Sequence, residues 1–212
     1  IIDVPNDRRI SYGELDNRVR RLANGFTEIC GLEKGQRVAV LSKNCIESME
    51  TYYACAQSGL IVQPLNWRLG IPELQRILVD GEPSAIICSG EFDELKQQLR
   101  QLIEAPHWLS FGTGGDNTYE QLIAAASTDT QRMDAAIGDE DPVLILYTGG
   151  TTGDSKGALH THKSLYMGML NQTVAERIVP TDVYMLTGQM FHIPVGLAMN
   201  YMSHGGPLVL IN

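Results

Sequence analysis

Cysteine is scarce in this chain and forms no metal-site or disulfide pattern. Four cysteines occur among 212 residues, at positions 30, 45, 55 and 88, with no Cys-x-x-Cys pair and no histidine cluster beside them. Zinc modules need closely spaced ligand pairs, and disulfide-stabilised domains need many cysteines in a short chain. Both classes are therefore excluded, and we expect the thiols to be reduced.

Long apolar runs and an excess of basic residues are also missing. No run of about 18 apolar residues occurs, and the opening Ile1-Ile2-Asp3-Val4-Pro5 lacks the basic head and apolar middle of a secretion signal. Lysine and arginine total 16 against 25 aspartates and glutamates, for a formal net charge of -9. We therefore expect a cytoplasmic protein with no transmembrane segment and no general nucleic-acid surface, in which any bound anion is held locally.

Hydrophobic residues make up 43% of the chain, which is enough to bury a real core. The chain starts without methionine and ends at Asn212, where a strand is expected to finish. We expect it to be an excerpt of a longer protein.

Strands and helices are predicted to alternate. A capping box at Ser11-Tyr12-Gly13-Glu14 predicts a helix that runs to about residue 29 and stops at Gly31. Further elements are a hairpin at 2–10, strands at 37–41, 60–65, 84–88, 107–111 and 183–186, and helices at 47–57, 73–79, 91–103 and 119–126. This alternation predicts an α/β fold of doubly wound, largely parallel sheets with helices on both faces.

The most informative stretch runs from Asp141 to His162. An apolar strand candidate at 143–146 is followed by residues 148–157, which are dense in glycines and hydroxyls, contain Lys156, and offer nothing to bury. Glycines let backbone N–H groups approach one anion, and the hydroxyls and the lysine add donors, so the segment resembles a phosphate cradle. It is not a Walker loop, because Lys156 follows Ser155 and precedes Gly157. The plain alternative is a glycine-rich hairpin tip.

The cradle is expected to join two strands, the second at 157–161. A helix should then run from about residue 163 to before Pro180. Its expected apolar face carries Leu165, Met169, Val174 and Ile178.

Residues 147–157 resemble the phosphate loop of the adenylate-forming ligases, a superfamily that includes acyl-CoA synthetases, luciferases and peptide-synthetase adenylation domains. The family pattern is Tyr-Thr/Ser-Ser-Gly-Thr-Thr-Gly-x-Pro-Lys-Gly, and the chain departs from it at Gly149 and Ser155. Gly149 removes a hydroxyl, and Ser155 loosens the backbone before Lys156. The resemblance extends over the whole chain and indicates the front of the large N-terminal domain, without the C-terminal domain. Its parts are 1–126, a connector at 127–141, and the phosphate-loop part at 142–212.

Two further stretches resemble this family. Residues 64–69 resemble Pro-Leu-Asn-x-Arg-Leu of acyl-CoA synthetases; the plain alternative is a strand exit in which Asn66 satisfies turn backbone and Arg68 lies on the surface. Phe191, His192 and Gly196 match a Pro-x-Phe-His-x-x-Gly stretch that lines the acyl pocket, whereas Gln189 departs from its proline. The resemblance thus implies substrate binding by Phe191, His192 and Gly196, with His192 at the mouth of the carboxylate pocket.

The reaction implied by the resemblance has two steps. A carboxylate, expected from a fatty acid, attacks the α-phosphorus of ATP and releases pyrophosphate, and coenzyme A then converts the acyl-adenylate to a thioester. Lys156 and Thr152 are the expected catalytic residues, and Thr152 is the expected Mg²⁺ ligand. Nucleotide binding is assigned to Thr148, Gly149, Gly150, Thr151, Thr152, Gly153, Asp154, Ser155 and Lys156. The excerpt alone is expected to be inactive.

The small-molecule partners are therefore an acid and ATP, and a homodimer is compatible with the sequence. Two alternatives remain: a catalytically silent nucleotide-binding or structural relative with a substituted loop, and an amino-acid adenylation domain. A dinucleotide-binding oxidoreductase is disfavoured because no Gly-x-Gly-x-x-Gly follows the first strand.

Overall fold

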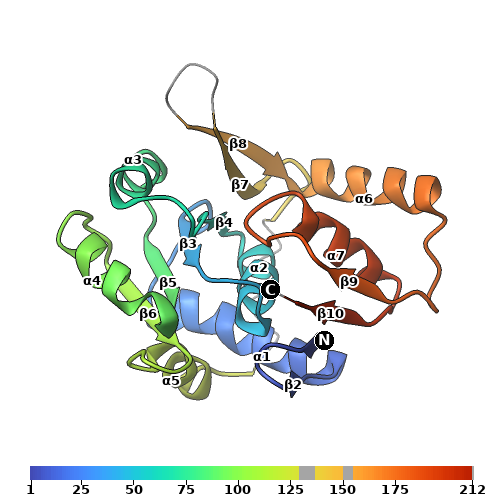
Figure 1. Ribbon diagram of the computed structural model, residues 1–212, viewed down its shortest axis with the longest axis horizontal. Coiled ribbons are helices and arrows are strands. Elements are labelled where there is room, and N and C mark those ends of the chain that lie inside the picture. Colours follow the sequence, from blue (N-terminus) through green and yellow to red (C-terminus); the bar gives the residue numbers. More distant parts are fainter. Residues whose placement is uncertain (129–136, 150–154, 212) are drawn as a thin grey trace.

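Two β-sheets and their helices make up the fold in the computed structural model, which describes residues 1–128, 137–149 and 155–211. Figure 1 shows the larger sheet beside the smaller one, with the β7–β8 hairpin at one edge of the larger sheet projecting away from the rest of the chain. The larger sheet has six strands in the order β6-β5-β3-β4-β7-β8. Its strands are β3 (Arg37–Leu41), β4 (Ile61–Pro64), β5 (Ala85–Ser89), β6 (His107–Phe111), β7 (Pro142–Thr148) and β8 (Lys156–Thr161).

Neighbouring strands of the larger sheet are parallel except β7 and β8, which are antiparallel. The chain passes from β3 to β4 on one side and then crosses to β5 on the other, which creates a topological switch point between β3 and β5. The helices that make these crossovers and cover the sheet are α1 (Tyr12–Asn24) with its π-helical extension (Gly25–Ile29), α2 (Ile46–Ser58), α3 (Ile71–Gly81), a 3-10 turn (Gly90–Phe92), α4 (Asp93–Arg100) and α5 (Thr118–Ala125).

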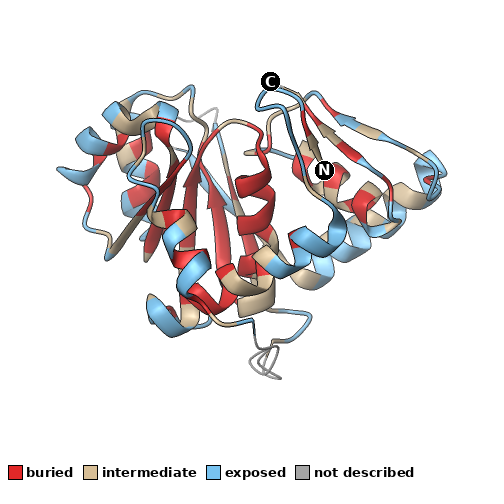
Figure 2. Cartoon of the chain, turned by 90° about the horizontal axis from the view of Figure 1, so that it is seen from below, coloured by how far each residue is buried: buried red, intermediate tan, exposed pale blue. Residues whose placement is uncertain are grey.

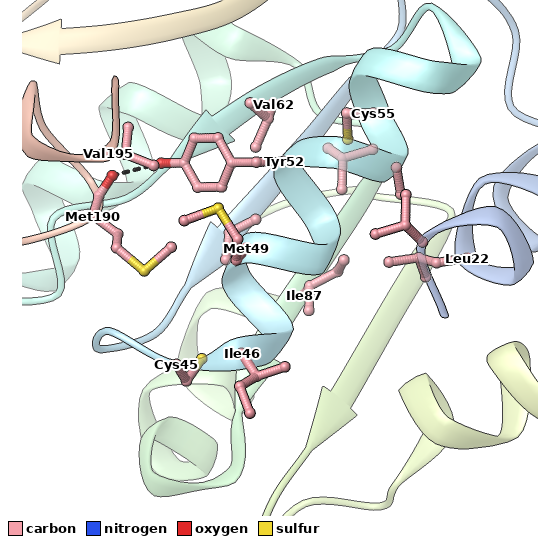
Figure 3. Packing of buried hydrophobic residues seen from close by; sticks show 14 of the residues in the cluster. Leu22, Cys45, Ile46, Met49, Tyr52, Cys55, Val62, Ile87, Met190 and Val195 are labelled. Atoms are coloured by element: carbon pink, nitrogen blue, oxygen red, sulfur yellow. Dashed lines mark hydrogen bonds between the residues drawn. The ribbon is translucent and has the colours of Figure 1, made fainter. Parts of the chain in front are cut away.

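The central strands β3, β4 and β5 of the larger sheet are buried on both faces. Because side chains alternate along a strand, Val38 and Val40 join the core beneath α1, α2 and α5, whereas Ala39 and Leu41 join a second core with α3 and α4. Figure 2 shows these strands coloured almost entirely as buried, and Figure 3 shows α2 packed in the first core. The predicted doubly wound α/β class is confirmed.

The smaller sheet joins the two ends of the chain. Its order is β2-β1-β10-β9, with β1 parallel to β10 and β10 parallel to β9. The remaining elements are β1 (Ile2–Asp3), β2 (Arg8–Arg9), α6 (His162–Glu176), β9 (Tyr184–Leu186), α7 (Pro194–Ser203) and β10 (Leu208–Leu210). The predicted division at 127–141 stays a prediction, and residues 129–136 lie outside the described part.

Most local predictions are confirmed within a few residues. Ser11 caps α1 with the reciprocal bonds of a capping box, and the hairpins at 2–10 and after β7 are both present. The predicted apolar face of the helix after the cradle is confirmed only at Leu165 and Met169, which are partly buried, and is wrong at Val174 and Ile178. α6 buries none of its residues, Val174 is 80% exposed, and the helix ends at Glu176 because Arg177 takes a left-handed conformation, so Ile178 lies beyond it. Across the described ranges, no helix combines the length and apolar character that membrane crossing requires.

Candidate functional site

The β7–β8 hairpin presents the two ends of the predicted cradle side by side. Thr148 and Lys156 are register partners in the last pair of the hairpin. Gly149, which comes after Thr148, and Ser155, which comes before Lys156, are the next residues toward the tip. All four residues are exposed, and Gly149 has open space around the position of a Cβ. Gly150, Thr151, Thr152, Gly153 and Asp154 lie outside the described residues. The hairpin therefore brings the outer donors of the cradle together at an exposed tip.

Lys156 is exposed at this tip. Among the described residues it forms no ion pair, whereas Lys163, two residues beyond the end of β8, pairs with Glu140 at 2.6 Å. A lysine with no carboxylate partner can pair its positive charge with an anionic ligand such as a phosphate group. The two lysines thus lie close in the sequence but differ in what their charges can do.

Packing under the hairpin explains one glycine of the motif. Gly157 lies opposite Tyr147, and a Cβ added there would come within 2.6 Å of Ile145 and 3.2 Å of the Tyr147 ring. The Tyr147 hydroxyl donates a 2.6 Å hydrogen bond to Asp80 of α3. Burial, followed by this carboxylate, raises the pKa of Tyr147, so the phenol stays protonated. Gly157 thus makes room for the side chains that fix the hairpin.

The second predicted segment is a turn between β9 and α7 that carries Phe191 and His192. Phe191 is half-buried and His192 is exposed. Nδ1 of His192 accepts a 2.7 Å hydrogen bond from the backbone N–H of Ile193, so a neutral ring in this arrangement carries its proton on Nε2. The ring is therefore held by its own turn and presented outward.

Side chains from α2 and from the loops that follow β3 and β4 hold the start of this turn. Asn44 bonds the backbone of Gly188 and Met190, and the Tyr52 hydroxyl donates to the Met190 carbonyl at 2.6 Å, as the dashed line in Figure 3 shows. The indole N–H of Trp67 donates to Oε1 of Gln189 at 3.0 Å. Sequence reasoning missed Asn44, Tyr52 and Trp67 as site residues, although Asn44 lies three residues after a predicted strand and Trp67 lies inside the 64–69 stretch.

The 64–69 stretch itself matches its plain interpretation. Asn66 accepts a 3.0 Å bond from the backbone N–H of Arg68, which closes an Asx turn after β4. Arg68 is exposed, and its guanidinium lies 4.9 Å from the centre of the Trp67 ring. Among the described contacts, this arginine therefore supports Trp67.

An apolar cavity of about 420 Å³ lies beside α6 and α7, and a second of about 530 Å³ adjoins it. Gly196 and Val195 line both, together with Leu144 of β7. Gly196, the third predicted substrate residue, therefore lies next to space that suits an apolar group.

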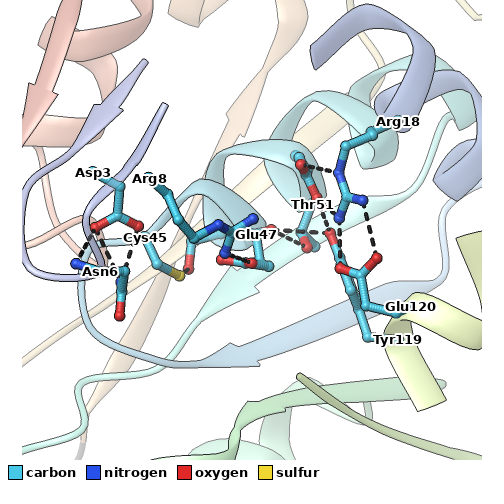
Figure 4. Close-up of polar contacts among 11 residues, drawn as sticks. Asp3, Asn6, Arg8, Arg18, Cys45, Glu47, Thr51, Tyr119 and Glu120 are labelled. Atoms are coloured by element: carbon cyan, nitrogen blue, oxygen red, sulfur yellow. Dashed lines mark hydrogen bonds and ion pairs between the residues drawn. The ribbon is translucent and has the colours of Figure 1, made fainter. Parts of the chain in front are cut away.

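A polar cavity of about 310 Å³ lies at the switch point between β3 and β5. Its basic groups are already neutralised, since Arg8 pairs with Glu47, as Figure 4 shows, and Lys43 pairs with Glu91 at 2.6 Å. Burial raises the pKa of the Cys45 thiol that lines it, so this thiol stays protonated at neutral pH and is a poor nucleophile.

The fold is that of a doubly wound α/β protein with an exposed hairpin at one edge of its larger sheet, and comparison with known proteins gives the family. The family model described as AMP-binding enzyme matches residues 1–212, so the chain belongs to the AMP-binding enzyme family.

Curated relatives are CoA ligases. The chain is 36% identical to a feruloyl-CoA synthase from Amycolatopsis sp over 86% of this chain and 34% of the relative. It is 32% identical to an indoleacetate–CoA ligase from Aromatoleum aromaticum over 88% of this chain and 37% of the relative. The chain thus spans little more than a third of these relatives.

Solved structures share the fold. The inhibitor-bound N-terminal domain of FACL13 from Mycobacterium tuberculosis aligns with a TM-score of 0.89 at 26% identity, covering 99% of this chain and 52% of that one. ATP-bound MatB from Rhodopseudomonas palustris aligns with a TM-score of 0.85 at 28% identity, covering 100% of this chain and 41% of that one.

Proposed function

We propose that this chain is the front part of an ATP-dependent acid–thiol ligase, which activates a carboxylic acid as an acyl-adenylate and transfers the acyl group to coenzyme A. The observation that carries the proposal is the exposed hairpin end, where Thr148 and Lys156 are paired on either side of a segment whose sequence is rich in phosphate-type donors. The CoA ligase relatives and the ATP-bound structural neighbour support the same reaction.

Lys156 acts electrostatically in this proposal. Negative charge grows on the leaving pyrophosphate, and an ammonium group already at the hairpin tip stabilises that charge without reorganising. Thr148 and Ser155 donate from the same tip. The donor set fits a triphosphate, since it contains hydroxyls, glycine backbone and one cation and, within the described residues, no acid paired with Lys156. We assign Mg²⁺ to Thr152; the ion would compensate phosphate charge.

The acid is assigned to the other part of the site. His192 is exposed on its turn, and Gly196 adjoins apolar space, so a carboxylate at the turn can direct an apolar chain along α7. A fatty acid is the first substrate class to test. The proposal places the enzyme in the cytoplasm and is compatible with a homodimer, and residues 1–212 alone are expected to be inactive.

Pyrophosphate exchange by the full-length protein, with a panel of fatty, aromatic and amino acids, tests the function. We expect Lys156→Ala to lower kcat about 100-fold or more, as removal of one preorganised donor does in other enzymes. Lys163→Ala is the matched control, because this lysine is paired with Glu140 on the surface. Exchange with no acid would favour a silent relative, exchange with amino acids alone would favour an adenylation domain, and normal exchange by Lys156→Ala would contradict the role of the lysine.

A further inference from the structure

The turn that carries His192 is attached to the larger sheet mainly through the residue before Phe191. Both backbone groups of Met190 are bonded by side chains: its N–H donates to Oδ1 of Asn44 at 2.8 Å, and its carbonyl accepts from Tyr52. The turn also closes on itself, because Gly188 packs so tightly on Pro194 that a Cβ would collide with the ring. The position of Met190 therefore determines the positions of the next two residues, Phe191 and His192.

Asn44 connects three parts of the chain. Its Nδ2 donates to the carbonyl of Gly188 at 2.9 Å and to the carbonyl of Ile211 at 3.0 Å, while its Oδ1 accepts from Met190. The side chain is 1% exposed and lies between β3 and α2. It thereby joins the loop after β3 to the turn and to the end of β10.

A primary amide is the side chain suited to this place. The amide of Asn44 accepts one hydrogen bond and donates two at the same time. At neutral pH an aspartate side chain can only accept, and an alanine side chain can neither accept nor donate. Water cannot easily replace these bonds at a buried position, so a lost partner leaves backbone groups unsatisfied. The turn should then shift rather than remain in place.

We propose that Asn44 is a positioning residue for the acid: it sets the place of the Phe191–His192 turn. This rests on the proposed function, in which that turn meets the carboxylate. The three hydrogen bonds through which Asn44 holds the turn go to Gly188, Ile211 and Met190. None of these residues belongs to the β7–β8 hairpin. A defect at Asn44 should therefore affect the acid far more than ATP.

The test measures pyrophosphate exchange by the full-length protein with its best acid, varying acid and ATP separately. Asn44→Ala and Asn44→Asp should lower kcat/KM for the acid about tenfold to a hundredfold, as small displacements of positioning groups do, with KM for ATP changed less than about twofold. Asn24→Ala is the matched control, since Asn24 is also a buried asparagine bonded to backbone, at Ser127.

Trp67→Phe is a second, milder variant, which removes the indole donor to Gln189 and keeps an aromatic ring. It should raise KM for the acid more than KM for ATP. This variant therefore tests the proposal even if the Asn44 variants do not fold. Equal effects on acid and ATP, or effects no larger than those of Asn24→Ala, would overturn the assignment while leaving the proposed function intact. A wild-type protein that exchanges with no acid would overturn both.

Discussion

Helices α2 and α6 are similar in length but opposite in burial. α2 buries nine of its 13 residues, including Glu47 and Glu50, whereas α6 buries none of its 15. α2 lies against the larger sheet and α1, with Tyr119 and the Met190 turn on its other sides. The comparison shows that the neighbours of a helix, more than its own apolar residues, decide its burial.

Burial of α2 depends on pairing its charges. Nε and Nη2 of Arg18 bond Glu50 at 2.6 and 3.0 Å, the Tyr119 hydroxyl donates to Glu50 at 2.9 Å, and Arg18 also bonds Glu120 (Figure 4). Burial raises the pKa of Glu50, and Arg18 and Tyr119 oppose that rise. A buried carboxylate without such partners would be costly.

The largest expected effect is therefore the loss of Arg18. Arg18→Met leaves Glu50 buried without its cation, and we expect the free energy of unfolding to fall by about 3 kcal/mol or more. Arg20→Met, which breaks an exposed pair with Asp16, should cost less than about 1 kcal/mol. Urea denaturation of both variants measures the difference. Equal losses of unfolding free energy in the two variants would show that the buried pair of Arg18 with Glu50 stabilises the fold no more than an exposed pair does.

Methionines on the two helices give a second, smaller contrast. Met49 of α2 is fully buried, and Met49→Ala should cost about 2 to 3 kcal/mol through lost contacts and a cavity. Met167 of α6 is 48% exposed, and Met167→Ala should change stability by no more than about 0.5 kcal/mol. Similar losses in thermal or urea unfolding would mean that α6 is more tightly packed than its exposure indicates.

Local patterns predicted much of this fold, because they depend on neighbours in sequence. The capping box at Ser11 and the strand at 37–41 are of this kind, and the Tyr147 to Gly157 pattern gave the family. Burial of Glu50 could not be predicted, since its partners Arg18 and Tyr119 are far away in the sequence. The same holds for the anchoring of the His192 turn by Asn44, which becomes visible only when the two sheets are placed together.

The smallest expected effect is at the start of α6, where the charged groups involved are partly exposed. Asp141 accepts a 2.6 Å bond from the Gly138 N–H and pairs with Lys34 at 2.6 Å, and its carbonyl accepts from the N–H of His162. The Gly138 bond, followed by Lys34, holds the pKa of Asp141 below its ordinary value of 3.8. The charged carboxylate therefore stabilises the fold above that value, and the contribution is lost as the pH falls through the lowered pKa.

Asp141→Asn should consequently be less stable than the wild type at neutral pH, and the gap should narrow as the pH falls below 3.8. Urea midpoints across this range measure it, and high salt should reduce the effect because the pair with Lys34 is partly exposed. Glu140→Gln is the matched control, since it removes a neighbouring carboxylate whose partner Lys163 is exposed. A gap that stays constant with pH would show that the Asp141 charge does not hold the start of α6, and that this helix depends on packing as α2 does.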